Sequence, residues 1–447
     1  MSNNQAGKTS RRTFLKASGV LAATGAMASR VPHVHAAEGG PIKLALIGCG
    51  GRGTGAVVNA FSTTGGPVKL HAMADVFEDH VVGRLRTLVE RFPQKVDVPE
   101  DRRFVGFDAY KKAIDSLDPG DVAILTTHAA FRPLHFEYAA NKGINVFMEK
   151  SFAPDTPATK RMMAASEVAK QKNLKVSVGF MWRHSEERQE VIRRIHDGQI
   201  GDVHTLRIYR MHGPCHTPPL PEGEHELKFQ LGRGVRFNWL SSGFFVDWHC
   251  HNVDVACWAK GDWPVSAQGV AGQTDPAAGN LLDHYSIEFT FKDGTKLFAY
   301  TRHMNGCWDT YSDYAHGTKG AAVLMTNLSQ PKTRIYSSHD MSPQNLVWQY
   351  EGSEKNPYDV EWQVLVDAIR ADTPHNEADR ACQANIAALM GRMASQTGKY
   401  VTWDEAYNST FQYVENIDDM TWDTPAPIKA GPDGRYSAPV PGAADAM

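Results

Sequence analysis

The chain has 447 residues, which is enough for two domains with substantial cores rather than one compact unit. Hydrophobic residues make up 42% of the chain and charged residues 22%, a composition typical of soluble globular proteins, and the formal net charge is only −3. This balance argues against nucleic-acid binding, and no stretch of the sequence is suited to stable insertion in a membrane.

The first 36 residues differ from the rest of the chain, because they carry five basic and no acidic side chains. Ser-Arg-Arg-Thr-Phe-Leu-Lys at 10–16 precedes a run of small residues, and the segment resembles a twin-arginine export signal. Cleavage after Ala36 would leave 42 basic and 50 acidic side chains, a net charge of −8. We therefore expect a periplasmic or extracellular protein with the twin-arginine export machinery as a partner. The alternative is a disordered basic tail.

An apolar run at 44–47 ends in glycines at Gly48, Gly50 and Gly53. This G-x-G-x-x-G pattern after a strand signal is typical of dinucleotide binding, because glycine permits a sharp turn, close approach of a pyrophosphate and close packing of the next helix. A second apolar strand, at 68–74, ends at Asp75, whose carboxylate would accept hydrogen bonds from the adenine ribose.

The cofactor type follows from two side chains near this turn. The charge of Asp75 would repel a 2′-phosphate and therefore favours NAD, whereas Arg52 nearby keeps NADP possible.

Helices and strands alternate in the first part of the chain. Helices are predicted at 79–92, 108–117, 132–141 and 156–172, and strands at 121–126, 144–148 and 175–180. Alternation predicts an α/β fold with a parallel, doubly wound Rossmann sheet, whose ligands lie beyond the carboxyl ends of the strands. We expect this NAD(P)-binding domain to span residues 41–165.

The pattern changes after a helix predicted at 185–197. Strands are predicted at 204–209, 265–270, 283–291 and 296–301, the last two joined through an Asp-Gly turn. Two amphipathic helices follow, at 358–371 and 379–396. We expect a second α/β domain over 166–423, built on an open, mainly antiparallel sheet that serves substrate binding and oligomerisation, and an irregular tail over 424–447.

A run of polar residues begins at Asp247. If the run is helical, Asp247, His251 and Asp254 share one face, whereas His249 points elsewhere. An acid one turn before a histidine can fix the imidazole tautomer and raise its basicity, as a general base for alcohol oxidation requires. The alternative is that His251 is a core histidine capped by Asp247.

Metal binding has little support in the sequence. His249 and His251 would diverge by about 200° on a helix, so they are poorly placed to share an ion. Another group, His212, Cys215 and His216, lies at a Pro-rich loop and is better interpreted as the rim of a pocket. The six cysteines show no paired spacing, and folding in a reducing compartment makes structural disulfides unexpected. We expect no metal.

Together these motifs resemble the Gfo/Idh/MocA oxidoreductase family along nearly the whole length after the signal. The motifs are the Gly48–Gly53 loop, Asp75, Glu149-Lys150, Ser242-Gly243 before the Asp247 run, and Trp-Asp-Glu-Ala at 403–406. The resemblance implies that the catalytic residues Lys150, Asp247 and His251 surround the hydroxyl being oxidised. It implies cofactor contacts at Gly48, Gly50, Gly51, Arg52, Gly53, Asp75, Thr126, His135, Glu149 and Lys150. It implies substrate contacts at Trp182, Arg183, His249 and His251.

Two departures from the family pattern limit how far these residue roles can be carried over to this chain. Ser151 stands where the family usually has a proline after Glu-Lys, so Lys150 could sit differently. His249 stands where small residues are common and could narrow the pocket. For Trp182 and Arg183 the alternative is ordinary packing between domains.

The function implied is an exported oxidoreductase that moves hydride between a tightly held NAD(P) and a hydroxyl of a sugar, glycoside or polyol. One alternative is a redox-neutral, NAD-dependent glycoside hydrolase that oxidises, eliminates, hydrates and reduces. Another is a non-catalytic sugar- or nucleotide-binding protein. The family resemblance also implies a homodimer or homotetramer.

Overall fold

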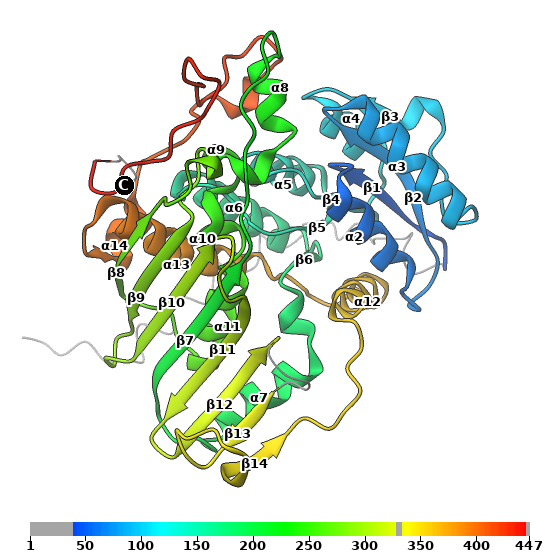
Figure 1. The fold of residues 1–447 in the computed structure, drawn as a ribbon. Coiled ribbons are helices and arrows are strands. Elements are labelled where there is room, and N and C mark those ends of the chain that lie inside the picture. The colour runs from blue at the N-terminus through cyan, green and yellow to red at the C-terminus, as the bar shows by residue number, and fades with distance from the viewer. Residues whose placement is uncertain (1–38, 328–332, 444–447) are drawn as a thin grey trace, which may run out of the picture. The chain divides into compact units, whose positions relative to one another are not determined.

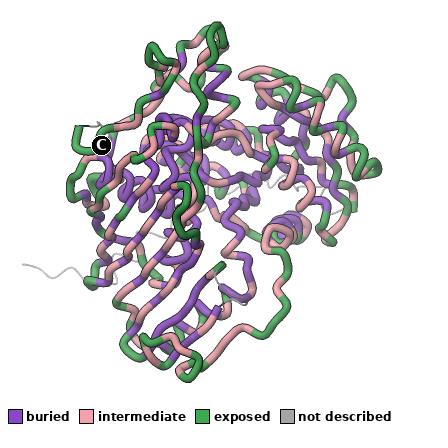
Figure 2. Tube along the Cα trace, viewed as in Figure 1, coloured by how far each residue is buried: buried purple, intermediate pink, exposed green. Residues whose placement is uncertain are grey.

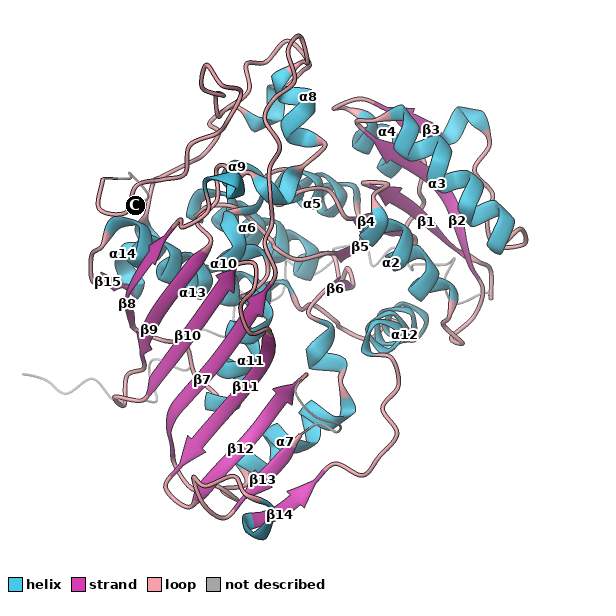
Figure 3. Ribbon diagram, in the orientation of Figure 1, coloured by secondary structure: helices cyan, strands magenta, loops and turns pink. Residues whose placement is uncertain are grey.

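The computed structural model describes residues 39–327 and 333–443. The predicted signal segment, 1–36, lies outside the described residues, as do the last four residues of the predicted tail. The described chain contains one six-stranded and one nine-stranded sheet with helices packed against both (Figures 1 and 3). None of its helices is long and apolar enough to cross a membrane.

The first sheet is parallel throughout and has the strand order β3-β2-β1-β4-β5-β6. Its strands are β1 (Ile42–Ile47), β2 (Val68–Asp75), β3 (Arg103–Val105), β4 (Val122–Leu125), β5 (Asn145–Met148) and β6 (Val176–Val178). The accompanying helices are α2 (Gly51–Phe61), α3 (Glu78–Arg91), α4 (Ala109–Asp115), α5 (Arg132–Lys142) and α6 (Thr156–Gln171). The doubly wound sheet predicted from the alternation is thus confirmed, and it continues beyond residue 165 to β6.

Local sequence explains several of the element ends. Helix α6 begins where the Asp155 side chain accepts a hydrogen bond from the amide of Ala158, and α5 ends at Gly143, which takes the left-handed conformation with φ of 80°. The strands β4 and β5 are buried at every position, as expected for a sheet covered on both faces.

The second sheet has the order β14-β13-β12-β11-β7-β10-β9-β8-β15 and is mainly antiparallel, with one parallel pair, β7 and β10. Its strands are β7 (Val203–His212), β8 (Ser266–Gly272), β9 (His284–Thr290), β10 (Lys296–His303), β11 (Thr310–Gly317), β12 (Gly320–Thr326), β13 (Arg334–Tyr336), β14 (Leu346–Gln349) and β15 (Val401–Thr402). The mainly antiparallel sheet predicted for the second part of the chain is confirmed, including the tight β9–β10 connection.

One face of this sheet packs on helices. The helices of this part are α7 (Glu186–His196), α8 (Glu226–Leu231), α9 (Asn238–Ser241), α10 (Gly243–Asp247), α11 (Cys250–Lys260), α13 (Ala378–Thr397) and α14 (Trp403–Asn408). On β7, Leu206 and Ile208 are fully buried in the core beneath these helices, whereas Arg207 and Tyr209 on the opposite face are only half-buried. Figure 2 shows buried and less buried positions alternating along the strands of this sheet. Alternate β7 residues therefore face the helices.

Helix α12 (Pro357–Arg370) returns to the parallel sheet from the far end of the chain. Its Trp362 is fully buried and stacks on Phe147 of β5 with ring centroids 4.4 Å apart. The neighbouring Glu361 is also fully buried, and neither of its carboxyl oxygens makes a hydrogen bond. Burial, with repulsion from Glu149 and Glu377, raises the pKa of Glu361 well above its ordinary value.

Glu361 should make the fold less stable as the pH rises. The folded state keeps this proton to a higher pH than the unfolded chain, so the stability cost is absent below about pH 4 and grows as the pH rises from there towards the folded pKa. We expect Glu361→Gln to raise the Tm relative to the parent protein at pH 8 and to raise it less at pH 5. Thermal unfolding at both values measures this, with exposed Glu90→Gln as control; equal gains at both pH values would contradict it.

Candidate active site

The glycine turn after β1 has the geometry that a bound diphosphate requires. Gly48 has φ of 96°, and a Cβ built on it would lie 2.6 Å from the amide nitrogen of Thr127. A Cβ on Gly53 would lie 2.2 Å from the carbonyl oxygen of Gly48, so neither position admits a side chain. Gly50 and Gly51, in contrast, face open space with no atom within 4 Å of such a Cβ. The backbone there is free to meet a ligand.

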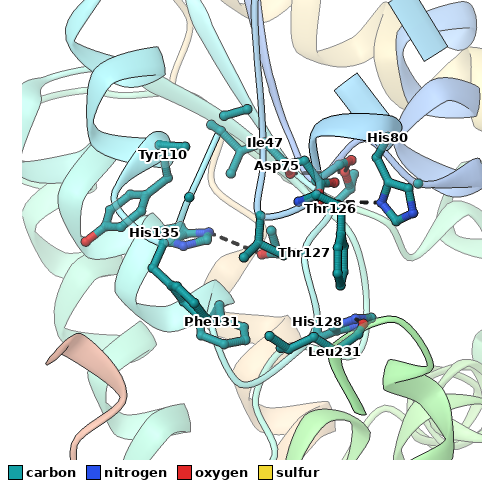
Figure 4. A pocket seen from close by; sticks show the side chains of 18 of the residues that line it. Ile47, Asp75, His80, Tyr110, Thr126, Thr127, His128, Phe131, His135 and Leu231 are labelled. Carbon is teal, nitrogen blue, oxygen red and sulfur yellow. Dashed lines mark hydrogen bonds and ion pairs between the residues drawn. The ribbon is translucent and has the colours of Figure 1, made fainter. Parts of the chain in front are cut away.

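This turn borders a cavity of about 260 Å³ (Figure 4). Asp75 lies on its wall, where one carboxylate oxygen accepts a hydrogen bond from the amide of Cys49 at 2.6 Å and the other from the amide of Phe77 at 2.9 Å. The Thr126 hydroxyl, which also lines the cavity, donates to the carbonyl of Gly48 at 2.6 Å and so holds the turn in place. The carboxylate and the open glycine backbone fit the ribose and diphosphate of a dinucleotide.

His135 forms the deeper wall of the cavity. Its ring stacks on Tyr110 with centroids 4.2 Å apart, and Nδ1 lies 3.2 Å from the Thr127 hydroxyl, toward which Figure 4 shows it pointing. Burial lowers the pKa of His135 to about 3, so the ring is neutral. A neutral, stacked imidazole suits an uncharged part of a ligand.

A segment far along the chain contributes to this cavity. Leu231, at the end of α8, lines it, and its carbonyl lies 2.9 Å from Nε2 of His128. Trp422, in the C-terminal segment, packs on the lining residues Phe77 and Phe107, with ring centroids 5.9 and 5.1 Å away. The cavity wall therefore includes a residue of α8, and the C-terminal segment packs against two other lining residues.

Arg52 is held by interactions within the protein. Its guanidinium lies 3.0 Å from the buried Glu149 carboxylate, donates to Asn59 at 2.7 Å and stacks over Tyr358 at 4.6 Å. Burial raises the pKa of Glu149 although Arg52 and Lys150 oppose this. Arg52 and Glu149 thus pair with each other next to the glycine turn.

Lys150 and Asp247, which are 97 residues apart in sequence, meet in the structure. Lys150 Nζ donates to the backbone carbonyl of Asp247 at 2.7 Å and lies 3.7 Å from its Oδ1. Ser151, which replaces the usual proline, donates from its hydroxyl to the same Oδ1 at 3.0 Å, and the Lys150–Ser151 peptide bond is cis. The substitution therefore adds a hydrogen bond that proline could not make.

The predicted continuous helix through this run is wrong. Helix α10 ends at Asp247, and α11 begins only at Cys250, so Asp247 and His251 lie on different helices. Asp247 Oδ2 and His251 Nδ1 are both buried, and neither makes a hydrogen bond. The predicted increase in the basicity of His251 is also wrong, because burial, followed by the charges of Lys150 and Arg210, lowers its pKa well below the ordinary value. His251 is a neutral imidazole beside a lysine.

The predicted substrate residues are dispersed. Arg183 is held by Asp254 through hydrogen bonds of 2.7 and 2.8 Å, an arrangement that favours the packing interpretation. His249 is fully buried and hydrogen-bonds to Thr301. Trp182 donates from its indole nitrogen to the Tyr311 hydroxyl at 2.7 Å.

The group formed by His212, Cys215 and His216 in the sequence does not form a cluster in the structure. His216 bonds to Asp275 at 2.8 Å, whereas His212 packs edge-on against Trp248. All six cysteines are free thiols. Within 39–327 and 333–443, no three His, Cys, Asp or Glu side chains gather as an ion would need.

Sequence reasoning missed two features of this region. One is the hydrogen bond from the Ser151 hydroxyl to Asp247. From the sequence, the change from proline to Ser151 was interpreted only as the loss of a backbone constraint. The other is Arg210 on β7, which lies close enough to His251 to lower its pKa. A signal for Arg210 was present, because Leu206, Ile208 and Arg210 alternate on β7 and must share a face.

Comparison with known proteins gives matches to two family models. Residues 189–323 match the GFO/IDH/MocA C-terminal domain, and residues 8–28 match a TAT (twin-arginine translocation) pathway signal sequence. Inositol 2-dehydrogenase of Rhizobium meliloti (strain 1021) is 24% identical over 262 residues, which cover 57% of this chain and 71% of that protein. Inositol 2-dehydrogenase 4 of Saccharopolyspora erythraea is 34% identical over 108 residues, 24% of this chain and 30% of that one.

Solved structures share the fold. Aldose-aldose oxidoreductase from Caulobacter crescentus superimposes with a TM-score of 0.62 at 17% identity, covering 81% of this chain and 100% of that one. Scyllo-inositol dehydrogenase from Lactobacillus casei with bound NAD(H) and scyllo-inositol gives 0.60 at 20% identity, covering 82% and 100%. The chain therefore contains a match to the GFO/IDH/MocA C-terminal domain and shares the fold of these oxidoreductases, and its twin-arginine signal indicates export.

The open space at Gly50 yields a test of the cofactor site. Its φ of −74° is accessible to any residue, so Gly50→Val should fold normally, yet its side chain would fill the space needed by a diphosphate. We expect NAD affinity to fall by at least about ten-fold, or 1.4 kcal/mol, with little change in Tm. Calorimetric titration of nucleotide-free protein measures this, with Gly83→Val on α3 as control. An unchanged Kd for NAD would show that the glycine turn does not contact the cofactor.

Proposed function

We propose that this protein is an exported, NAD-dependent oxidoreductase that oxidises a hydroxyl group of a sugar, glycoside or polyol and keeps its cofactor bound between turnovers. The observation that carries the proposal is the meeting of Lys150, at the carboxyl end of β5, with Asp247 at the end of α10. Ligands of doubly wound sheets bind beyond this edge. The parallel-sheet part would hold the cofactor, and the nine-stranded part would hold the substrate and contact other subunits through its open face.

The cofactor assignment rests on the glycine turn, Asp75 and Arg52. Gly50 and Gly51 would meet the diphosphate and Asp75 the adenine ribose. Arg52, the residue that kept NADP possible, is already engaged by Glu149 and Asn59, which favours NAD. When bound, NAD would supply the acceptor for the hydride removed from the substrate carbon.

Lys150 and His251 have complementary roles in this proposal. The ammonium of Lys150 would hold the reacting oxygen and stabilise negative charge that develops on it. His251 is neutral, and its buried Nδ1 has no hydrogen-bond partner, so the ring can take up the hydroxyl proton. Asp247, fixed by Ser151, would keep Lys150 in position.

Export makes retention of the cofactor useful, because free nicotinamide nucleotides are scarce outside the cytoplasm. Leu231, which lines the cavity, and Trp422, which packs on the lining residues Phe77 and Phe107, support such retention. Each turnover would then need a second sugar substrate to return the cofactor to its starting state.

Lys150→Ala tests the proposal directly. We expect kcat for oxidation of the best polyol or sugar to fall by at least about 10²-fold, since the ammonium stabilises charge only as the reaction proceeds, whereas the nucleotide content of the purified protein persists. Nucleotide released on denaturation is identified by mass, and turnover is followed by the absorbance of reduced nicotinamide. Exposed Lys69→Ala serves as control.

Three results would contradict the proposal. Aglycone release from aryl glycosides without net change in NAD would indicate the redox-neutral hydrolase instead. Undiminished turnover in Lys150→Ala would remove the lysine from the chemistry. Purified protein without nucleotide, and without affinity for added NAD, would leave only a binding role.

The lowered pKa of His251 gives a pH dependence. The neutral ring is the active form, and a lowered pKa keeps it neutral at more acid pH than an ordinary histidine allows. We expect kcat/KM to stay level from pH 8 down through 6.5, the ordinary pKa of histidine, and to fall only below it. A profile that declines with a midpoint near 6.5 would exclude a buried His251 as base.

A further inference from the structure

Three polar side chains gather around Trp248, the residue that directly follows Asp247. The rings of His303 on β10 and His212 on β7 lie with centroids 4.8 and 5.8 Å from that of Trp248, and the Arg210 guanidinium lies 5.9 Å from it. Arg210 and His212 continue the alternation of the buried Leu206 and Ile208, so they face the helices and not the open side of the sheet. This cluster, which we call the Trp248 cluster, therefore lies next to the proposed catalytic residues.

Arg210 has no anionic partner among the residues that the structure describes. Its guanidinium stacks over Tyr311 at 3.8 Å, but it makes no ion pair, and its Nε is buried without a hydrogen bond. Nε2 of His212 is likewise buried without a partner. A buried polar atom left unpaired lowers the stability of the fold, more so when the group is charged, so two such atoms in one cluster point to a ligand that would pair with them.

The charge balance around the cluster is positive. Burial, followed by Arg210, lowers the pKa of His212, and burial, followed by His212 and Arg210, lowers that of His303 to about 3, so both rings are neutral. The acid Asp313, hydrogen-bonded by Asn252 at 2.6 Å, has a pKa raised by burial to about 7 and is only partly charged at neutral pH. Asp247 is engaged by Lys150 and Ser151, so it does not neutralise Arg210.

Two arginines of this part of the chain are paired with acids. Arg183 is neutralised by Asp254, and Arg188 by Glu187, at 2.7 and 3.0 Å. Arg302, on the adjacent strand β10, has no acidic partner among the described residues either, but its guanidinium donates a hydrogen bond to the carbonyl of Trp308, whereas Arg210 stacks on Tyr311.

We propose that Arg210 binds a carboxylate of the substrate, so that the enzyme acts on acidic sugars in preference to their neutral counterparts. This inference rests on the proposed oxidoreductase function and specifies its substrate class. The planar guanidinium can bind a carboxylate through two parallel hydrogen bonds, and the Trp248 ring provides an apolar face for the carbon skeleton of the sugar. Arg210 and Lys150 both lower the pKa of His251, so a carboxylate at Arg210 would lie in the same site as the proposed base and the lysine.

Matched substrate pairs test the proposal on the cofactor-loaded protein. We expect kcat/KM for D-glucuronate and D-galacturonate to exceed that for D-glucose and D-galactose by at least about ten-fold. In Arg210→Met this ratio should fall to near one, mainly through a higher KM for the acid, and Arg210→Lys should restore part of it. Arg207→Met is the matched control, because Arg207 lies on the same strand but on the opposite face, and it should leave the ratio unchanged.

Binding measured without turnover separates this inference from the proposed function. Calorimetric titration of D-glucuronate into cofactor-loaded Lys150→Ala should show binding even though oxidation is lost, and the same titration into Arg210→Met should show at least about ten-fold weaker binding. Equal kcat/KM for acidic and neutral sugars would overturn the proposal. So would an Arg210→Met variant that loses acidic and neutral sugars alike, or a preference for D-glucose 6-phosphate over D-glucuronate.

Discussion

The contact between Lys150 and the carbonyl of Asp247 is the interaction on which the site depends. It joins the carboxyl end of a strand in the parallel sheet to the end of a short helix that packs on the nine-stranded sheet. Ser151 strengthens this contact, since its hydroxyl holds the Asp247 side chain from the same loop. Because Lys150 follows the end of β5 and Asp247 ends α10, the fold determines where the Lys150 ammonium meets the Asp247 carbonyl.

The parallel sheet could be predicted almost completely from the sequence, because a strand buried on both faces produces an unbroken apolar run, as at 122–125 and 145–148. Strands β11 to β14 were not predicted. Two of these strands, β13 and β14, are short. The helix at 358–371 was predicted from its periodicity, but nothing in the sequence indicated that its Trp362 packs on β5. That packing depends on tertiary contacts that local periodicity does not encode.

The site was predicted unevenly for a similar reason. Motif spacing predicted the glycine turn, Asp75 and Lys150 as site residues. Each lies at or just after the end of a parallel strand, so its place in the fold follows from its place in the sequence. The relation between Asp247 and His251 was wrong, since Trp248 and His249 interrupt the helix and remove the one-turn spacing that the argument assumed. Burial then determines the protonation of His251 in a way that no residue pattern reveals, because the desolvation depends on Phe180 and other distant residues that surround the ring.

The wall of the cavity beside the glycine turn has a consequence for the order of events in the cell. Leu231, which lines the cavity, and Trp422, which packs on the lining residues Phe77 and Phe107, belong to segments made long after the glycine turn has left the ribosome, so this wall is not complete until translation has almost ended. Under the proposed function, a nucleotide retained there would be acquired in the cytosol by a finished polypeptide. The twin-arginine route, which carries proteins already folded, is compatible with that sequence of steps, whereas threading an unfolded chain through a membrane would leave the nucleotide behind.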